Sequence, residues 1–115
     1  MNHLFQPAPE EMRLPQVLAA LSDPVRLRLV AQMADGAERT CGVEAWDVPV
    51  HKSTLSHHFR VLREAGVTRT RIDGRSRWIR LRRADLDARF PGLLDAVLAS
   101  LAEETRDDPA DAAAG

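Results

Sequence analysis

The chain has 115 residues, of which 44% are hydrophobic, so it can form one compact domain and leaves little room for a second. It holds one cysteine, which excludes an intramolecular disulfide. No run approaches the roughly 18 apolar residues of a membrane span, and the first eleven residues lack the basic start and apolar stretch of a secretion signal. We therefore expect a cytoplasmic domain with no membrane partner.

The net charge of −1 conceals a strong separation of charge along the chain. Residues 51–83 contain ten basic and two acidic side chains, a net charge of +8, whereas the remainder carries six basic and fifteen acidic side chains. Codon bias in a GC-rich genome can enrich arginine over lysine, but it does not explain the clustering. The pattern indicates one surface suited to a polyanion and another that avoids it.

Residues 10–21 and 24–34 are predicted to form the first two helices. In the first, apolar residues recur at the spacing of one helix face. Before the second, Asp23 supplies a polar cap ahead of a proline at the first helical position, and Gly36 ends the helix. A short third helix is predicted over residues 41–46, with Thr40 as its N-cap.

The fourth predicted helix, residues 52–65, has two chemically different faces. At 100° per residue, Leu55, Phe59 and Leu62 share one face, which is expected to pack on the core. Gly66 follows as a stop signal. The opposite face carries only polar side chains: Ser53, His57, Arg60 and Glu64.

A β-hairpin and a final helix complete the predicted domain. Residues 67–72 and 75–82 flank Asp73-Gly74, a two-residue hairpin signal. A last helical stretch begins near Ala84 and continues past Pro91 as a long apolar stripe.

The predicted boundaries are a flexible N-terminus at residues 1–9, a domain at 10–102 and a disordered acidic tail at 103–115. The predicted fold class is mainly α with a small β-hairpin. The order of elements is that of a winged helix-turn-helix, with terminal helices left over to pair with a second subunit.

Two motifs resemble those of ArsR-type bacterial repressors. Residues 21–29 read LSDPVRLRL, which resembles the second-helix motif of that family. Residues 52–67 read KSTLSHHFRVLREAGV, which resembles its recognition helix, whose usual form ends SHHLxxLxxAGL. The resemblance covers about residues 17–101. It implies a winged helix-turn-helix homodimer that is joined through its first and last helices.

The two leftover apolar stripes agree with that implied interface. A chain this short has more apolar residues on these helices than one small core can bury. The expected interface residues are Leu14, Val17, Leu18, Leu93, Leu94, Val97, Leu98 and Leu101.

Departures from the family pattern argue against its usual metal sites. Many members sense metals through a Cys-x-Cys pair in the third helix, but residues 40–43 read TCGV here. A second family site uses aspartate and histidines on the last helix, yet this chain has no histidine after His58. We therefore expect no metal and no cofactor at those sites.

Cys41 has two interpretations. At a helix start the local dipole can lower a thiol pKa, which would make Cys41 a redox sensor. The favoured alternative is a small buried apolar residue. An irregular metal site with His3, His51 and nearby acids stays open as a third.

The segment with net charge +8 contains the expected DNA contacts. Polar residues of the fourth helix would meet base edges and phosphates, and arginines of the hairpin would lie along the duplex backbone. His58 projects toward the core side and is expected to be structural, and Trp78 is expected to pack at the wing base. The expected contacts are Lys52, Ser53, Thr54, Ser56, His57, Arg60, Arg69, Arg71, Arg75 and Arg77.

The sequence thus predicts a sequence-specific, double-stranded-DNA-binding transcriptional regulator. The resemblance to this family favours a repressor. A two-fold dimer favours an operator that is an inverted repeat. No nucleotide loop, hydrolase elbow or metal-hydrolase helix motif is present, so an enzyme is not expected. The alternatives are a metal- or thiol-responsive sensor around Cys41 and a winged helix that binds only protein.

Overall fold

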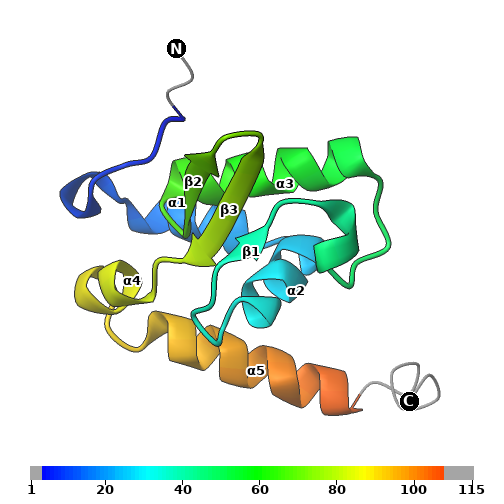
Figure 1. Ribbon diagram of the computed structural model, residues 1–115. Coiled ribbons are helices and arrows are strands. Elements are labelled where there is room, and N and C mark those ends of the chain that lie inside the picture. Colours follow the sequence, from blue (N-terminus) through cyan, green and yellow to red (C-terminus); the bar gives the residue numbers. More distant parts are fainter. Residues whose placement is uncertain (1–3, 108–115) are drawn as a thin grey trace.

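A computed structural model describes residues 4–107 as helices packed on a small antiparallel sheet (Figure 1). Within these residues, no helix is long and apolar enough to cross a membrane. Figure 1 shows α3 along one side of the molecule and α5 along the other, with α2 between them. The elements are η1 Pro9–Glu11, α1 Leu14–Leu21, α2 Pro24–Gln32, β1 Arg39–Thr40, η2 Val43–Ala45, α3 Lys52–Ala65, β2 Thr68–Asp73, β3 Ser76–Leu81, α4 Arg83–Arg89 and α5 Leu93–Asp107.

The corner between α1 and α2 depends on Asp23. Its side chain accepts hydrogen bonds from the backbone N–H groups of Val25 at 2.8 Å and Arg26 at 3.0 Å, so it caps α2 as the sequence predicts. Partial burial alone would raise the pKa of Asp23, but these backbone hydrogen bonds and the nearby Arg26 lower it. The ionised carboxylate is therefore the form that holds this corner.

The sheet has the order β1-β3-β2, with both neighbouring pairs antiparallel. The sequence did not predict β1, and the helix expected over residues 41–46 is only the short 3-10 helix η2, which follows β1. Arg39 and Thr40 pair with Ile79 and Trp78 of β3. That pairing joins residues far apart in the chain, so a local pattern could not reveal it.

The hairpin is confirmed, but its loop lies one residue later than predicted. Asp73 and Ser76 are paired across the strands, which leaves Gly74 and Arg75 as the two loop residues. Gly74 has φ 60°, and among residues 4–107 no non-glycine residue has a positive φ. A glycine at the first loop position is the pattern of a type II′ turn rather than of the type I′ turn that Asp-Gly suggests.

The core lies between α3, the sheet and the first two helices. Leu55, Phe59 and Leu62 are buried, which confirms the predicted core face of α3. Gly66 ends α3 with φ 93°, and an added Cβ there would lie 2.7 Å from Cγ of Met12. Any side chain at that position would therefore clash as well as strain the backbone.

Both ends of the domain differ from the expected boundaries. The side-chain amide of Gln6 donates to the carbonyl of Thr70 at 3.0 Å and accepts from its N–H at 2.7 Å. Residues 4–8, expected to be flexible, thus include a side chain bound to the free edge of β2. At the other end, α5 continues to Asp107 instead of ending near 102. Residues 1–3 and 108–115 lie outside the described part of the chain.

Replacing Asp23 by alanine is expected to lower the free energy of unfolding at pH 7 by about 1 kcal/mol, because two N–H groups of α2 lose their acceptor. The folded-state pKa of Asp23 lies below the ordinary 3.8, so this contribution is present above pH 3.8 and is lost as the pH falls below it. Urea titrations at several pH values measure both effects. Glu44→Ala, which removes a carboxylate without a described hydrogen bond, is the control. Equal losses in both variants would contradict the cap.

Candidate nucleic-acid interface

The exposed face of α3 presents a row of polar side chains to solvent. All six residues predicted for DNA contact on this helix are exposed, while its apolar face is buried. The N-cap residue His51 makes no side-chain cap, so the first N–H groups of α3 keep no side-chain acceptor. Such a helix start favours an anion such as a phosphate. The six residues are Lys52, Ser53, Thr54, Ser56, His57 and Arg60.

A hollow of ≈ 320 Å³ lies between this face of α3 and the wing, which is the hairpin of β2 and β3. Arg77 of β3 faces the same hollow as Ser56 and Arg60 of α3. Arg63, which the sequence analysis missed, also lines it, because it follows Arg60 by three residues and so lies beside it on the helix. The full lining is Ser53, Ser56, His57, Arg60, Arg63 and Arg77, with no acidic residue.

Arg63 is held in place beneath this surface. Its side chain is buried, and Nε donates to the carbonyl of Phe5 at 3.3 Å. Burial lowers the pKa of its guanidinium, since a charge is costly away from water. Arg63 therefore contributes positive charge at the base of the hollow from a fixed position.

The four predicted wing arginines do not share one surface. Side chains alternate along a strand, and the burial of β2 and β3 shows which face packs on α3. Arg77 lies on the side of α3, and Arg75 lies in the hairpin loop. Arg69 and Arg71 lie on the outer face of the sheet, away from α3.

Those two outer arginines are also engaged within the chain. Arg71 donates to both carboxylate oxygens of Glu38 at 3.1 Å and lies over the ring of Trp78, while Arg69 is 3.9 Å from Asp85. The hydrogen bonds from Arg71 lower the pKa of Glu38. The sequence could not separate the inner from the outer arginines, because strand register and loop position decide which face each residue occupies.

His58 is a structural residue, as the helix geometry predicts. Its side chain is buried, and Nδ1 lies 3.1 Å from Nη1 of Arg26. Burial lowers the pKa of His58, so the neutral ring can accept a hydrogen bond from Arg26 near pH 7. Arg26 also donates to the carbonyl of Ala20 at 2.6 Å. One guanidinium thus links the end of α1 to the middle of α3.

Cys41 does not stand at a helix start. It directly follows β1, and its N–H donates to the carbonyl of Arg77 at 3.0 Å. Burial raises the pKa of the Cys41 thiol, which is the opposite of the lowered pKa that a redox sensor needs. Residues 4–107 contain no cluster of three potential metal ligands, and His3 lies outside that range.

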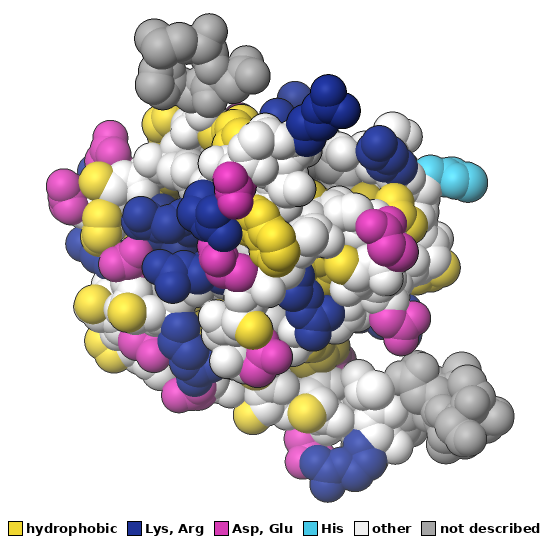
Figure 2. Space-filling model, in the orientation of Figure 1, with side chains coloured by type: hydrophobic (Ala, Val, Ile, Leu, Met, Phe, Trp, Pro, Cys, Tyr) yellow, Lys and Arg dark blue, Asp and Glu magenta, His cyan; other side chains and the backbone are white. Residues whose placement is uncertain are grey.

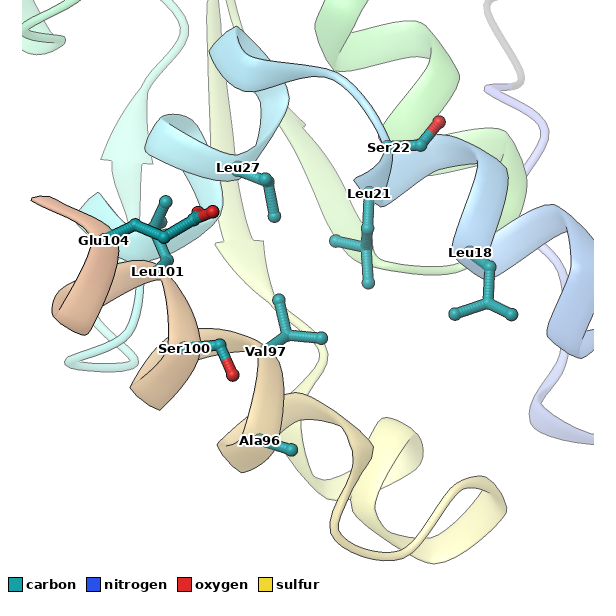
Figure 3. A pocket seen from close by; sticks show the side chains of 9 residues that line it. All are labelled: Leu18, Leu21, Ser22, Leu27, Ala96, Val97, Ser100, Leu101 and Glu104. Carbon is teal, nitrogen blue, oxygen red and sulfur yellow. The ribbon is translucent and has the colours of Figure 1, made fainter.

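The predicted dimer residues divide between the surface and the core. Val17 and Leu94 are 0% and 2% exposed, so both belong to the core of the subunit and cannot meet a partner. Leu14 and Leu18 of α1 are exposed. An apolar groove of ≈ 360 Å³ lies between α1, the start of α2 and α5 (Figure 3). It is lined by Leu18, Leu21, Ser22, Leu27, Ala96, Val97, Ser100, Leu101 and Glu104.

Comparison with known proteins gives consistent relatives. Residues 21–71 match the model of a family described as a helix-turn-helix domain. The chain is 38% identical over 81 residues to an uncharacterized HTH-type transcriptional regulator, YceK of Bacillus subtilis strain 168, across 70% of this chain and 81% of the relative.

Two solved structures extend the comparison. A possible transcriptional regulator for arsenical resistance is 32% identical, with a TM-score of 0.55, over 89% of this chain and 95% of its own. The transcriptional repressor BigR from Xylella fastidiosa is 30% identical, with a TM-score of 0.59, over 76% of this chain and 84% of its own.

Fold, exposed helix and relatives together define a winged helix-turn-helix transcriptional regulator. The two motifs at 21–29 and 52–67 fall on the α1–α2 corner and on α3, the elements that build the helix-turn-helix. The chain belongs to the family of HTH-type transcriptional regulators. Proteins of this family are regulators and not enzymes.

Cys41 is expected to react with iodoacetamide at pH 7 more slowly than a free cysteine, because its raised pKa lowers the thiolate fraction. The rate can be followed by mass spectrometry on the native protein. The same chain in urea provides the control and should react at the rate of a free thiol. If the native protein were alkylated faster than the chain in urea, the result would support the interpretation of Cys41 as a redox sensor.

Proposed function

We propose that the protein is a sequence-specific, double-stranded-DNA-binding repressor that acts as a homodimer in the bacterial cytoplasm. The observation that carries this proposal is the hollow between α3 and the wing, where arginines from both elements meet exposed serine and histidine side chains. An acid-free basic surface beside an exposed helix suits a duplex better than a protein partner.

On this proposal α3 enters the major groove. Ser56 and His57 lie in the middle of its exposed face, where they can reach base edges, and Arg60 can contact a guanine or a phosphate. Lys52 and the uncapped start of the helix meet the backbone of one strand. Recognition of sequence is thus assigned to the helix.

The wing contributes charge near the backbone. Arg75 stands at the tip of the hairpin, and Arg77 lies between the tip and α3. Neither makes an ion pair with another described residue, so both can meet phosphate. Arg69 and Arg71, which the sequence placed in the same set, are not part of this proposed contact, because they lie on the outer face.

The second subunit is proposed to cover the exposed apolar residues of α1 and the flank of α5. Leu14 and Leu18 are 43% and 44% exposed, and the groove beside Leu18 continues onto Val97 and Leu101. Exposed leucines next to an apolar groove favour burial against a matching surface. A two-fold axis there would present two α3 helices to an inverted repeat.

Repression is proposed from the relatives and from the geometry of a dimer on a promoter. BigR, which shares the fold at 30% identity, is described as a transcriptional repressor. A dimer that covers a promoter can block polymerase without further contacts. The ligands of the family's usual metal sites are missing here, so zinc, cadmium and arsenite are not proposed as the signal.

Helix and wing variants should weaken DNA binding in different ways. Ser56→Ala or His57→Ala is expected to cost roughly 1–3 kcal/mol on the cognate duplex and almost nothing on a scrambled one. Arg75→Ala should weaken both duplexes by similar factors and reduce the slope of log K against log salt by about one. Titrations on both duplexes at several salt concentrations measure these effects.

Arg28→Ala is the matched control, because it removes an exposed arginine of α2 without a described ion pair and should change neither affinity nor slope. If the wing variant loses only cognate binding, the two roles are reversed. If the wild type binds neither duplex at low salt, the protein-binding alternative replaces the proposal.

Leu18→Glu is expected to yield monomers, because a carboxylate would be buried in the subunit interface. Sedimentation at micromolar concentration measures the state of assembly. Phe5→Glu, at an apolar residue that is 58% exposed and lies outside this face, is the control and should stay dimeric. A wild type that sediments as a monomer would remove the dimer from the proposal.

A further inference from the structure

Arg26 joins three helices through one guanidinium group. It belongs to α2, and its Nε donates to the carbonyl of Ala20 at 2.6 Å, while Nη2 donates to the carbonyl of Ala19 at 3.4 Å. Both carbonyls belong to the last turn of α1, where the negative end of the helix dipole attracts a cation. On its other side, Nη1 lies 3.1 Å from Nδ1 of His58 in α3. The guanidinium therefore holds the end of α1 against the middle of α3.

The α1 end of this link lies at the proposed dimer surface. Figure 3 shows Leu18, Leu21 and Leu27 pointing into the groove between the α1–α2 corner and α5. Arg26 directly precedes Leu27, so one corner holds both the guanidinium and a wall of the groove. A second subunit that is seated on this surface would therefore contact the corner that Arg26 holds.

The α3 end of the link lies next to the proposed reading face. His57 lines the hollow that we assign to DNA, whereas His58 is buried, and the centroids of the two rings are 5.6 Å apart. Successive residues of a helix point about 100° apart, so the orientation of His58 determines the direction of His57 and Ser56. Arg26 therefore stands between the dimer surface and the residues that are proposed to read base edges.

The angle between α1 and α3 matters because a two-fold dimer has two reading helices. Figure 2 shows basic and acidic side chains intermixed over the face that it presents, so it is the acid-free hollow beside α3 that must be directed at the duplex. In a dimer, both hollows must meet half-sites whose centres are about 34 Å apart or a multiple of that. Apolar packing tolerates small shifts between helices, whereas a hydrogen-bonded group that moves loses its partner.

The link depends on the protonation state of His58, because only a neutral ring has a nitrogen that can accept the hydrogen bond. The ionisable groups that face His58 are Asp23 at the α1–α2 corner, Arg26 of α2 and His57 of α3, while α1 has no ionisable side chain. Burial lowers the pKa of His58 most, Asp23 opposes this shift, and Arg26 and His57 add to it. The pKa thus lies below the ordinary 6.5, so the link is intact near pH 7 and is lost as the pH falls through the lowered pKa.

We propose that Arg26, acting through His58, is a positioning residue for DNA recognition that sets the angle between α3 and α1, and with it the spacing of the two reading helices. The proposal rests on the proposed function as a DNA-binding homodimer. Loss of the link should penalise a duplex with two half-sites more than a duplex with one, because only the first requires the correct spacing. A purely structural role would weaken binding to both duplexes alike.

The first experiment compares His58→Leu with His58→Asn. Oδ1 of asparagine lies as many bonds from the backbone as Nδ1 of histidine, so asparagine keeps an acceptor that leucine removes. The probes are the inverted-repeat duplex that the wild type selects from a random library and the same duplex with one half scrambled. His58→Leu should bind the full repeat about tenfold more weakly and the half-scrambled duplex within about twofold of the wild type. His58→Asn should stay within about twofold of the wild type on both duplexes.

The outcomes separate this proposal from the proposed function. If His58→Leu loses equal affinity for the two duplexes, or loses none, the positioning role is wrong while DNA binding by the wild type stands. A loss in His58→Asn as large as that in His58→Leu would also overturn the role, because the acceptor is kept. If the wild type selects no duplex, the proposed function fails and the positioning role fails with it.

A second set of variants tests the link from the side of α2. Arg26→Lys keeps the charge but replaces the guanidinium fork by a compact ammonium, so it should also lose about tenfold on the full repeat. In the His58→Leu background the same change should have little further effect, as expected for two residues that act as a unit. Arg28→Lys, at an exposed position of the same helix, is the matched control and should bind as the wild type does. Additive losses from Arg26→Lys and His58→Leu would contradict the link.

The pH dependence gives a third measurement, which a contact without a titrating acceptor would not affect. Wild type and His58→Asn are titrated with the full repeat over the pH range in which NMR shows the ring of His58 to become protonated. The ratio of wild-type to His58→Asn affinity should fall as the pH is lowered, because protonation breaks the link in the wild type alone. Protonation of His57 acts on both proteins and cancels in the ratio. A constant ratio over this range would overturn the proposal that Arg26 acts through His58.

Discussion

The structure depends on the burial of one face of α3. Leu55, Phe59 and Leu62 are almost fully buried against the other helices and the sheet, and each contributes about 1.5–3 kcal/mol relative to an exposed position. This packing sets the rotation of the helix about its axis, so its polar face must point to solvent. The contact between Arg26 and His58 adds a polar link that ties the same helix to the α1–α2 corner. The exposure of the polar face of α3 therefore follows from the burial of its apolar face in the core.

The alternation of side chains in the two-stranded wing divides a single basic segment into two surfaces. Arg77 falls on the side of α3 and lines the hollow that we assign to DNA. Arg69 and Arg80 fall on the other side, beside the buried guanidinium of Arg82. Residues that are neighbours in the chain thus lie on different surfaces, because successive side chains of a strand point to opposite faces of the sheet.

Several features were readable from the residues alone because their causes are local. The helix over residues 52–65, its two faces and its glycine stop were all predicted, since 3.6-residue periodicity and a left-handed stop are properties of adjacent residues. The hairpin and the Asp23 cap followed from turn and capping chemistry in the same way. The family resemblance rested on these same local motifs, and the comparisons confirmed a helix-turn-helix transcriptional regulator.

Other features required the tertiary structure because their causes are not local. The pairing of Arg39 with Ile79, the one-residue shift of the hairpin loop and the burial of Val17 and Leu94 all depend on which segments meet across the fold. The sequence shows that residues 51–83 carry a net positive charge. Which of their arginines face α3 is decided by the strand register. The buried, unpartnered Nη2 of Arg82 was likewise invisible in the sequence, because a residue's solvent exposure is decided by neighbours distant in the chain.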